Sequence, residues 1–498
     1  MLFNSFAFFL VFLPLCLSGY FVLSKYSIKA SIVFLLLASV CFYGYWSLTY
    51  LPLLLGSIAI NYGVGGLINH CKGSGNESAA KYALILGLVL NLGALFFFKY
   101  FDFLVVNVGA LMGQVWLPAG IILPIGISFF TFTQIAYLVD CKAGKVSACK
   151  AENYGLFVTY FPHLIAGPII HHKDMMPQFV NPATHVFSTG RLTLGLLIFA
   201  VGLFKKIVLA DGVAVFVGPV FDVHYASLTM AEAWVGVLAY TFQLYFDFSG
   251  YCDMAYGLSY MFGVVLPINF NSPYKARSII DFWRRWHITL SSFLKDYLYV
   301  PLGGNRRGRV RRYLNLVITM LLGGLWHGAN WTFIVWGALH GVYLIANHAL
   351  RHLVGTDVEG RERCWANGAL MIASGVCITF LAVVLAWVFF WASSVSVALG
   401  VLKAMYQGTH TLQPGNLAGL NRIMNLHAGM LWVLTCASMA FLTPTIYDVL
   451  ERGKILDGKW HLQAISSEIL FGFLLVISLL LLAIGETRGV SEFLYFNF

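Results

Sequence analysis

The chain has 498 residues, of which 59% are hydrophobic and only 10% carry a formal charge. Soluble domains are about 45–50% apolar and about 25% charged. So few charges cannot cover the surface of a soluble protein, which excludes a cytoplasmic enzyme, a disordered chain and a disulfide-stapled secreted scaffold. The composition predicts a protein embedded in lipid, and its net charge of +10 must then be concentrated in a small part of the chain.

Apolar segments follow one another along the whole chain, and each is a candidate membrane helix. They cover residues 6–23, 31–46, 51–68, 82–98, 115–138, 154–170, 192–221, 231–261, 314–326, 331–348, 369–391, 431–446 and 469–484. The first lacks a basic n-region and a clear cleavage site, so we interpret it as a retained span. Some segments contain Gly or Pro, as in LPIGISFF at 123–130, which predicts an enclosed cavity that satisfies the interrupted backbone. We expect an all-α polytopic protein with one multi-span domain over residues 1–498.

Positive charge is concentrated in residues 275–312, which hold ten Lys and Arg side chains against two Asp side chains. The positive-inside rule places the loop 301–312 in the cytoplasm. Within this region, residues 278–300 are too charged for a span and too apolar for a loop. Asp281 and Arg285 stand at helical ion-pair spacing, so we expect an amphipathic helix that lies at the interface or re-enters the membrane.

The segment LLGGLWHGANWTFIVWGALHG at 321–341 places His327 and His340 in apolar surroundings. Ionisable groups inside a membrane are costly and mark candidate functional sites. The alternative is a buried imidazole that its neighbours satisfy. The two histidines are 13 positions apart, roughly 220° around a helix, so on a continuous helix they cannot form a joint catalytic or metal-binding pair. The sequence also contains no CxxC pair, so the cysteines do not suggest a metal site.

Acidic residues occur in YTFQLYFDFSGYCDMAYG at 240–257, which places Asp247 and Asp253 among apolar side chains. Buried acids need partners, so they either pair with the Lys and Arg of the basic region 275–312 or orient a catalytic histidine. A hydrolase triad of Ser249, His327 and Asp253 is a weaker alternative, because FDFSGYCD does not match the GxSxG elbow. The motif GGNRRGRVRR at 303–312 suits phosphate binding, and its alternatives are a topology signal and contact with anionic lipid headgroups.

Four ordered blocks carry a resemblance to a known family: FPHLIAGPI at 161–169, QLYFDFSGYCDMAYG at 243–257, DFWRRWHITLSSFLKDYLYVPLGGNRRG at 281–308 and MLLGGLWHGANWTFIVWGALHG at 320–341. They resemble the membrane-bound O-acyltransferase (MBOAT) family, in its bacterial branch that acetylates polysaccharides such as alginate. The terminal MLFNS and FLYFNF are also similar to that branch. The resemblance makes residues 161–341 the motif-dense catalytic core.

The resemblance implies a multi-pass protein of the bacterial inner membrane, with transmembrane and re-entrant helices around a central funnel or tunnel. It identifies the catalytic histidine of the WHG motif with His327 and a second family histidine, in RRWH, with His287. His340 in ALHG is the weaker candidate. The supporting residues expected around them are Trp326, Asp247, Asp253, Tyr245 and His340.

The expected reaction transfers acetyl from a cytoplasmic thioester, acetyl-CoA, to an extracytoplasmic polysaccharide, with His327 as general base. Acetyl-CoA is a co-substrate, and neither a bound cofactor nor a metal is expected. The CoA phosphates are expected on basic side chains, namely Arg284, Arg285, Lys295, Arg306, Arg307 and Arg309. Expected partners are periplasmic acetyl-transfer proteins, the polysaccharide and membrane lipid, but not nucleic acid. The alternatives are D-alanyl or other acyl transfer to a cell-wall polymer, and a non-enzymatic transporter or export-complex component.

Overall fold

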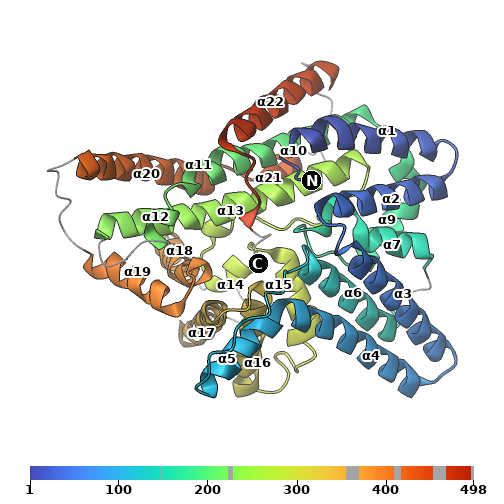
Figure 1. Ribbon diagram of the computed structural model, residues 1–498, viewed down its shortest axis with the longest axis horizontal. Helices are drawn as coiled ribbons and strands as arrows, with labels where there is room; N and C mark the ends of the chain where they lie inside the picture. The colour runs from blue at the N-terminus through green and yellow to red at the C-terminus, as the bar shows by residue number, and fades with distance from the viewer. Residues whose placement is uncertain (147–148, 222–227, 355–368, 409–416, 453–466, 495–498) are drawn as a thin grey trace. The chain divides into compact units, whose positions relative to one another are not determined.

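The computed structural model describes residues 1–146, 149–221, 228–354, 369–408, 417–452 and 467–494. Every regular element in these residues is a helix (Figure 1), which confirms the expected all-α class. Parts of the polar stretches 351–365, 407–426 and 448–461, and the last four residues of the FLYFNF motif, lie outside the described residues.

Contacts within the chain define two units, and each unit is built from separate stretches of sequence. The first unit comprises Met1–Phe204, Gly250–Ile268 and His461–Asn497, and the second comprises Lys205–Ser249, Asn269–Trp460 and Phe498. The expected core at 161–341 therefore contributes to both units. The long helix α13 (Met230–Met261) begins in the second unit and ends in the first.

In the first unit, α1 contacts α2, α3 contacts α4 and α6, and α10 contacts α22 (Figure 1). Its helices are η1 (Ala7–Phe12), α1 (Leu13–Ser24), α2 (Ile28–Trp46), α3 (Leu51–Gly73), α4 (Glu77–Leu95), η2 (Phe96–Tyr100), α5 (Phe101–Leu111), α6 (Ile127–Lys142), α7 (Ala151–Thr159), α8 (Phe161–Leu164), α9 (His172–Val180), η3 (Pro182–His185), α10 (Thr189–Leu203) and α22 (Ser467–Arg488).

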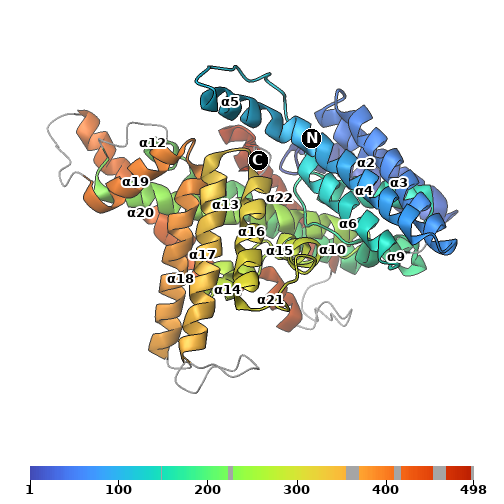
Figure 2. The same ribbon diagram turned by 90° about the horizontal axis from the view of Figure 1, so that it is seen from below.

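The second unit contains a row of three helices, α16, α17 and α18, that run side by side (Figure 2). Short helices α14 and η6 pack on this row. The helices of this unit are η4 (Phe204–Ala210), α11 (Asp211–Ala214), α12 (Gly218–Phe221), η6 (Pro273–Lys275), α14 (Ile279–Trp283), α15 (Ile288–Leu294), η7 (Lys295–Tyr299), α16 (Arg309–His327), α17 (Trp331–Val354), α18 (Ala369–Trp391), α19 (Val395–Gln407), α20 (Leu417–Leu442) and α21 (Ile446–Arg452), together with the first part of α13.

Nine helical segments within the described residues are long and apolar enough to cross a membrane. They are Ala7–Ser24, Ile28–Trp46, Leu51–Gly73, Glu77–Leu111, Thr189–Phe221, Trp331–Arg351, Leu370–Trp391, Met424–Glu451 and Ile469–Arg488. Each overlaps an apolar segment that the sequence predicts. The chain is therefore a multi-pass membrane protein.

Three segments depart from the helices that the sequence predicts. The run 154–170 divides into α7 and the short α8, and residues 165–170 are not helical. The apolar run 115–138 becomes helical only at Ile127, because Gly120 and Gly126 adopt left-handed backbone angles before it. Residues 278–300 form no single amphipathic helix but divide into α14, α15 and η7. The ion pair predicted between Asp281 and Arg285 is present, since Arg285 Nε donates to Asp281 Oδ1 at 2.8 Å.

Side chains satisfy the irregular backbone that precedes α6, as expected for non-helical chain in a membrane protein. The Asp102 carboxylate accepts from the three consecutive amides 119–121 at 2.8–3.1 Å. The hydroxyls of Tyr50 and Tyr43 donate to the carbonyls of Ile122 and Ile125. The interrupted run is thus held by protein groups.

The helices α16 and α17 form a hairpin whose backbones approach closely at glycines. A Cβ added at Gly324 would overlap the carbonyl oxygen of Phe333, and one added at Gly337 would overlap that of Met320. Small residues permit such close packing between membrane helices. Gly324, three residues before His327, therefore serves the packing of the hairpin.

The neighbouring glycines Gly323 and Gly324 give a matched test of this packing. Gly324→Ala forces backbone apart and should destabilise the protein by about 1–3 kcal/mol, the usual cost of overpacking. Gly323→Ala meets only the flexible tip of Leu294, at 3.2 Å, and should cost much less. Thermal unfolding in detergent measures both variants, and equal melting temperatures would contradict the close packing.

Candidate active site

Three buried histidines and two indoles of the second unit form a continuous chain of ring contacts, which we call the histidine cluster: His287, Trp326, His327, Trp336 and His340. Ring centroids along this chain are 6.1 Å apart for His287 and Trp326, 4.9 Å for Trp326 and His327, 5.2 Å for His327 and Trp336, and 4.7 Å for Trp336 and His340. The structure therefore joins all three histidines that the sequence singles out.

His327 is the last residue of α16, and the hairpin turn begins immediately after it. Gly328 is extended, and Asn330 starts α17 by accepting from the amide of Thr332 at 3.1 Å. Only 3% of His327 is exposed, and its ring packs edge-on against Phe390 of α18 at 5.0 Å. The helix break thus places an imidazole among aromatic rings.

The same break brings His327 and His340 into one cluster. His327 and His340 do not lie on one continuous helix, because α16 ends at His327 and α17 begins at Trp331, so the condition that separated them does not hold. Trp336 and His340 are four residues apart on α17, so they lie on one face of that helix. The hairpin turns this face towards His327, whose ring contacts Trp336.

His287 lies in a tight, strained turn that a single asparagine supports. Its backbone is left-handed, with φ of 42°, a region that costs a non-glycine residue about 1–2 kcal/mol. Asn269 holds the turn, because its carbonyl oxygen accepts from the Ile288 amide at 3.0 Å and its side-chain Oδ1 accepts from Thr289 N and Oγ1. The strain is thus retained at a residue with no exposed surface.

The contact between His287 and Asn269 fixes the tautomer of His287. Because Asn269 Oδ1 accepts from the amide of Thr289, it is the oxygen, and His287 Nδ1 must donate to it at 3.1 Å. A neutral imidazole then carries its lone pair on Nε2. Burial lowers the pKa of His287 to about 3, so the ring stays neutral around pH 7.

His340 has the opposite tautomer. The indole Nε1 of Trp283 donates to His340 Nδ1 at 3.3 Å, so Nδ1 is an acceptor and the ring proton lies on Nε2. His340 has no exposed surface, and the ring of Phe282 stacks over it at 6.1 Å. The cluster therefore presents one imidazole that accepts through Nε2 and another that donates through Nε2.

The two acidic residues expected near the histidines, Asp247 and Asp253, lie in different units of the chain. Asp247 lies in the second unit and pairs with Lys206, whose Nζ is 2.7 Å from Asp247 Oδ1 and 2.9 Å from Asp211 Oδ1. Asp253 is buried in the first unit. Asp247 thus neutralises a buried lysine, but Lys206 lies outside the basic region 275–312 in which the sequence placed the partner.

Most of the expected donor-binding cations lie on the surface. Arg284, Lys295, Arg306, Arg307 and Arg309 are exposed, whereas Arg285 is half-buried and held by Asp281. Arg309 begins α16 and His327 ends it, a rise of roughly 27 Å. Arg306, Arg307 and Arg309 therefore lie at the opposite end of α16 from His327, whereas Arg284 and Arg285 precede His287 closely in sequence.

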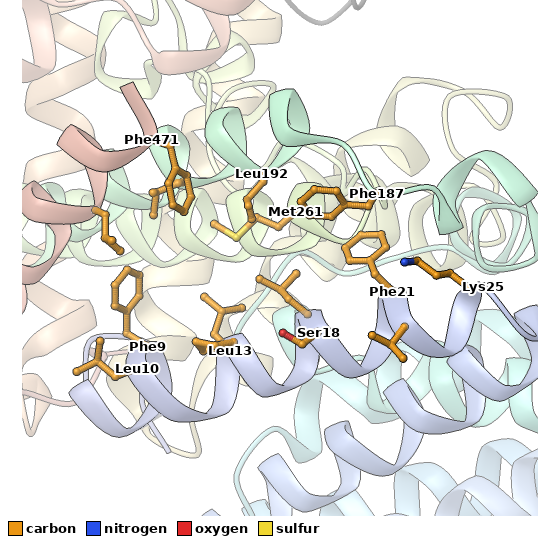
Figure 3. Close-up of a pocket in the computed structure, with 15 residues that line it drawn as sticks. Phe9, Leu10, Leu13, Ser18, Phe21, Lys25, Phe187, Leu192, Met261 and Phe471 are labelled. Atoms are coloured by element: carbon orange, nitrogen blue, oxygen red, sulfur yellow. The ribbon is translucent and has the colours of Figure 1, made fainter. Parts of the chain in front are cut away.

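A large apolar groove in the first unit contains none of the cluster residues. It encloses about 490 Å³ between α1, α10 and α22, and Phe9, Phe21, Phe187 and Phe471 line it (Figure 3). Apart from Ser18 and Lys25, its lining side chains are apolar. No histidine, aspartate or glutamate lines it, so it offers no side chain of the kinds expected to act as the base in acyl transfer. Among the described residues, no group of three or more His, Cys, Asp or Glu side chains could hold a metal ion.

Residues 140–388, half of the chain, match the model of MBOAT, the membrane-bound O-acyltransferase family. The chain is 45% identical over 432 residues to the peptidoglycan O-acetyltransferase of Helicobacter pylori, covering 81% of this chain and 80% of the relative.

The chain belongs to the MBOAT family.

Other relatives agree with this assignment. The probable alginate O-acetylase AlgI of Pseudomonas putida is 38% identical over 518 aligned residues, with both chains covered completely. A teichoic acid D-alanyltransferase of Streptococcus thermophilus is 27% identical over 285 residues, which cover 53% of this chain and 68% of the relative. This MBOAT chain is therefore an acyltransferase, as predicted, and the transporter and scaffold alternatives are set aside.

The hydrolase triad also lacks support in this MBOAT chain. Ser249 Oγ is buried and has no hydrogen-bond partner among the described residues, so His327 does not accept from it. A serine nucleophile needs a base within hydrogen-bond reach. Tyr245, another expected supporting residue, packs against Trp286 at 6.4 Å and Tyr274 at 5.1 Å, beside the cluster.

Sequence reasoning missed Asn269, Trp336 and Trp283. The four-residue spacing of Trp336 and His340 is a helical signal that could have paired them. Asn269 is 18 residues before His287, with a turn between them, and no periodicity links the two. Trp283 and His340 are 57 residues apart in sequence, so only the fold brings them together.

Proposed function

We propose that the protein transfers acetyl from a cytoplasmic thioester, acetyl-CoA, for O-acetylation of an extracytoplasmic polysaccharide, with His327 as the general base. The observation that carries this proposal is a buried imidazole, His327, held between Trp326 and Trp336 in the matched part of an MBOAT chain. The relatives named for O-acetylation of peptidoglycan and alginate support the choice of acetyl and of a polysaccharide.

The reaction needs one base and needs no covalent enzyme intermediate. His327 removes the proton of the acceptor hydroxyl as its oxygen attacks the thioester carbonyl carbon, and it then protonates the departing thiolate. His287 is the poorer base around pH 7, because its pKa is lowered to about 3. Its acceptor Nε2 suits a hydrogen bond from the acceptor hydroxyl or from a neighbouring donor.

The anionic donor is proposed to bind at the N-terminus of α16. Exposed arginines 306, 307 and 309 gather where the helix dipole is positive, and both effects favour phosphate oxygens. The thioester end must then extend roughly 27 Å along α16 to His327. This placement puts the donor and the polysaccharide on opposite sides of the inner membrane, with periplasmic proteins passing the acetyl group onward.

D-alanyl transfer to a teichoic acid is the second candidate function. It is supported by a relative of that name, which aligns with 53% of this chain, whereas the O-acetylation relatives align with 80% or more. The longer alignments favour acetyl as the cargo. Transfer of labelled D-alanine from a carrier protein, without transfer from acetyl-CoA, would reverse this preference.

The experiment that tests the proposal uses the purified full chain in detergent or in vesicles. Labelled acetyl-CoA is supplied with alginate, with peptidoglycan fragments, or without an acceptor. Label should move to one glycan in an alkali-labile ester, and the glycan that accepts it identifies the substrate. Label that stays on CoA with every acceptor, with and without added periplasmic fractions of the host, would refute the proposed function.

The arginines at the start of α16 can be tested separately. The variant Arg306→Gln/Arg307→Gln/Arg309→Gln should raise KM for acetyl-CoA about tenfold or more, because one charge-assisted hydrogen bond contributes about 1.5–3 kcal/mol. The kcat should change little, since these groups do not touch the reacting atoms. A control removes three exposed lysines elsewhere, at positions 25, 81 and 403. Equal KM in both triple variants would assign the arginines to topology alone.

A further inference from the structure

Within the part of the chain that the structure describes, Trp336 and His340 of the histidine cluster each have a buried ring nitrogen without a hydrogen-bond partner. The Nε1–H of Trp336 and Nε2 of His340 contact no acceptor among the described residues. Trp336 is 1% exposed and His340 is fully buried. Buried polar groups are normally hydrogen-bonded, so two orphaned donors in neighbouring rings require an explanation.

The proton on His340 Nε2 follows from the geometry on its other side. Trp283 donates to Nδ1 at 3.3 Å, and an imidazole that accepts at Nδ1 carries its proton on Nε2. An unpartnered Nε2 is therefore an unpartnered N–H. Trp283 acts here as a positioning residue, because its indole N–H donates to His340 Nδ1 and so selects the tautomer of His340.

Trp336 contacts the base of the proposed reaction, and His340 contacts Trp336. The ring centroids of Trp336 and His340 are 4.7 Å apart, and that of Trp336 is 5.2 Å from His327. The groups come from one face of α17 and from the end of α16, so the hairpin sets their spacing. His287 cannot take the donor role through Nε2, because its proton is on Nδ1 and is directed to Asn269.

Acyl transfer requires hydrogen-bond donors that stabilise negative charge on the carbonyl oxygen. When the acceptor oxygen attacks, the carbonyl π electrons move to the carbonyl oxygen, which becomes an oxyanion, while His327 takes the hydroxyl proton. The oxyanion then collapses, the C–S bond breaks, and the thiolate leaves with the proton from His327. Preorganised N–H donors that stabilise this oxyanion are each worth about 10²–10³ in kcat.

We propose that Trp336 Nε1–H and His340 Nε2–H form the oxyanion-binding pair, which holds the carbonyl oxygen of the acyl thioester. This inference rests on the proposed function, because it says where the thioester carbonyl binds within the same site. It gives His340 a direct part in the reaction and adds Trp336, which no sequence motif indicated. The ligand of the pair is a thioester carbonyl.

The kinetic test removes each donor while keeping a ring or a volume in place. Trp336→Phe and His340→Leu should each lower kcat about 10²–10³-fold with little change in KM for acetyl-CoA. His340→Gln offers an amide N–H near the Nε2 position and should recover part of the loss. Trp234→Phe is the control, because it removes an indole N–H that donates to Met405 O at 3.0 Å, outside the cluster. Its kcat should match that of the wild type.

A spectroscopic measurement separates oxyanion binding from packing. Carbonyl-labelled acetyl-CoA is bound without acceptor, and its isotope-edited infrared C=O band should move to lower frequency in the wild type. The band should return towards its aqueous position in Trp336→Phe, and Trp234→Phe should leave it unchanged. A variant that loses kcat but keeps the shifted band would refute the pair.

The two proposals fail in different ways. If the wild type transfers no acetyl to any acceptor, the proposed function is wrong. If the wild type is active and Trp336→Phe and His340→Leu keep kcat within about twofold, the oxyanion-binding pair is wrong and the function stands. An unshifted carbonyl band in an active wild type has the same meaning, because the donors would then hold a buried water.

Discussion

Replacing His327 by glutamine should lower kcat for acetyl transfer by about 10²–10⁴-fold, the usual contribution of a positioned general base. The imidazole is 3% exposed and packs between Trp326, Trp336 and Phe390, so the cluster holds it in one place. Glutamine keeps a polar group of similar length but cannot take up a proton. The KM for acetyl-CoA should stay near that of the wild type, because the expected donor contacts lie at the other end of α16.

A second buried histidine supplies the control for this loss. His185 is 8% exposed, and its Nε2 donates to the carbonyl oxygen of Phe179 at 2.8 Å in the first unit. His185→Gln can keep that donation, so the acetyl-transfer rate should stay near the wild-type value. Thermal unfolding in detergent shows whether each variant is folded. His327→Gln protein with the rate of the His185→Gln control would remove the catalytic assignment.

His287 should respond differently from His327. Its pKa, lowered to about 3 by burial, makes it a weak base, and Asn269 holds its Nδ1 proton. Its left-handed turn at the start of α15 gives it a structural part as well. We therefore expect that substitutions at His287 reduce both kcat and thermal stability, whereas substitutions at His327 reduce kcat alone.

The apolar pattern predicted the class of fold because lipid imposes a simple rule. A run of about 20 apolar residues is satisfied only as a helix, so each of the nine spans overlaps a predicted run. The pattern failed at 115–126, where Asp102 and two tyrosines replace the helical hydrogen bonds. Such compensation comes from distant side chains, and hydropathy does not reveal it.

The histidines of the site could be predicted, but their geometry could not. His327 and His287 stand out because imidazoles are rare in apolar sequence and because two motifs resemble those of one family. The separation of roughly 220° between His327 and His340 holds only on a continuous helix, and the break at Gly328 removes it. Their tautomers depend on Asn269 and Trp283, which are remote in sequence.

The second large effect concerns the buried ion pair of Lys206 and Asp247, whose side chains are 2% and 1% exposed. Asp247→Asn removes the closest counter-charge of a buried ammonium. Breaking one partner of a buried pair costs about 3–5 kcal/mol when the other charge is left uncompensated. Here Asp211 stays as a second, partly exposed counter-charge of Lys206, so we expect the lower part of this range. We therefore expect a large fall in the thermal unfolding temperature of this variant in detergent.

Asp211 provides the matched comparison, because it also contacts Lys206, at 2.9 Å, but is 20% exposed. Asp211→Asn should cost less, since solvent screens its charge. The double variant Lys206→Met/Asp247→Leu removes both buried charges and should regain part of the stability that Asp247→Asn loses.

The same variants separate structure from catalysis at Asp247. If the carboxylate serves Lys206, the folded fraction of Asp247→Asn protein keeps most of its acetyl-transfer rate, and the double variant transfers acetyl as well. If it orients a catalytic histidine, the rate per folded molecule falls as far as in His327→Gln, and restoring stability does not restore it. Because the 2.7 Å contact joins Asp247 to a buried cation, we expect the first result.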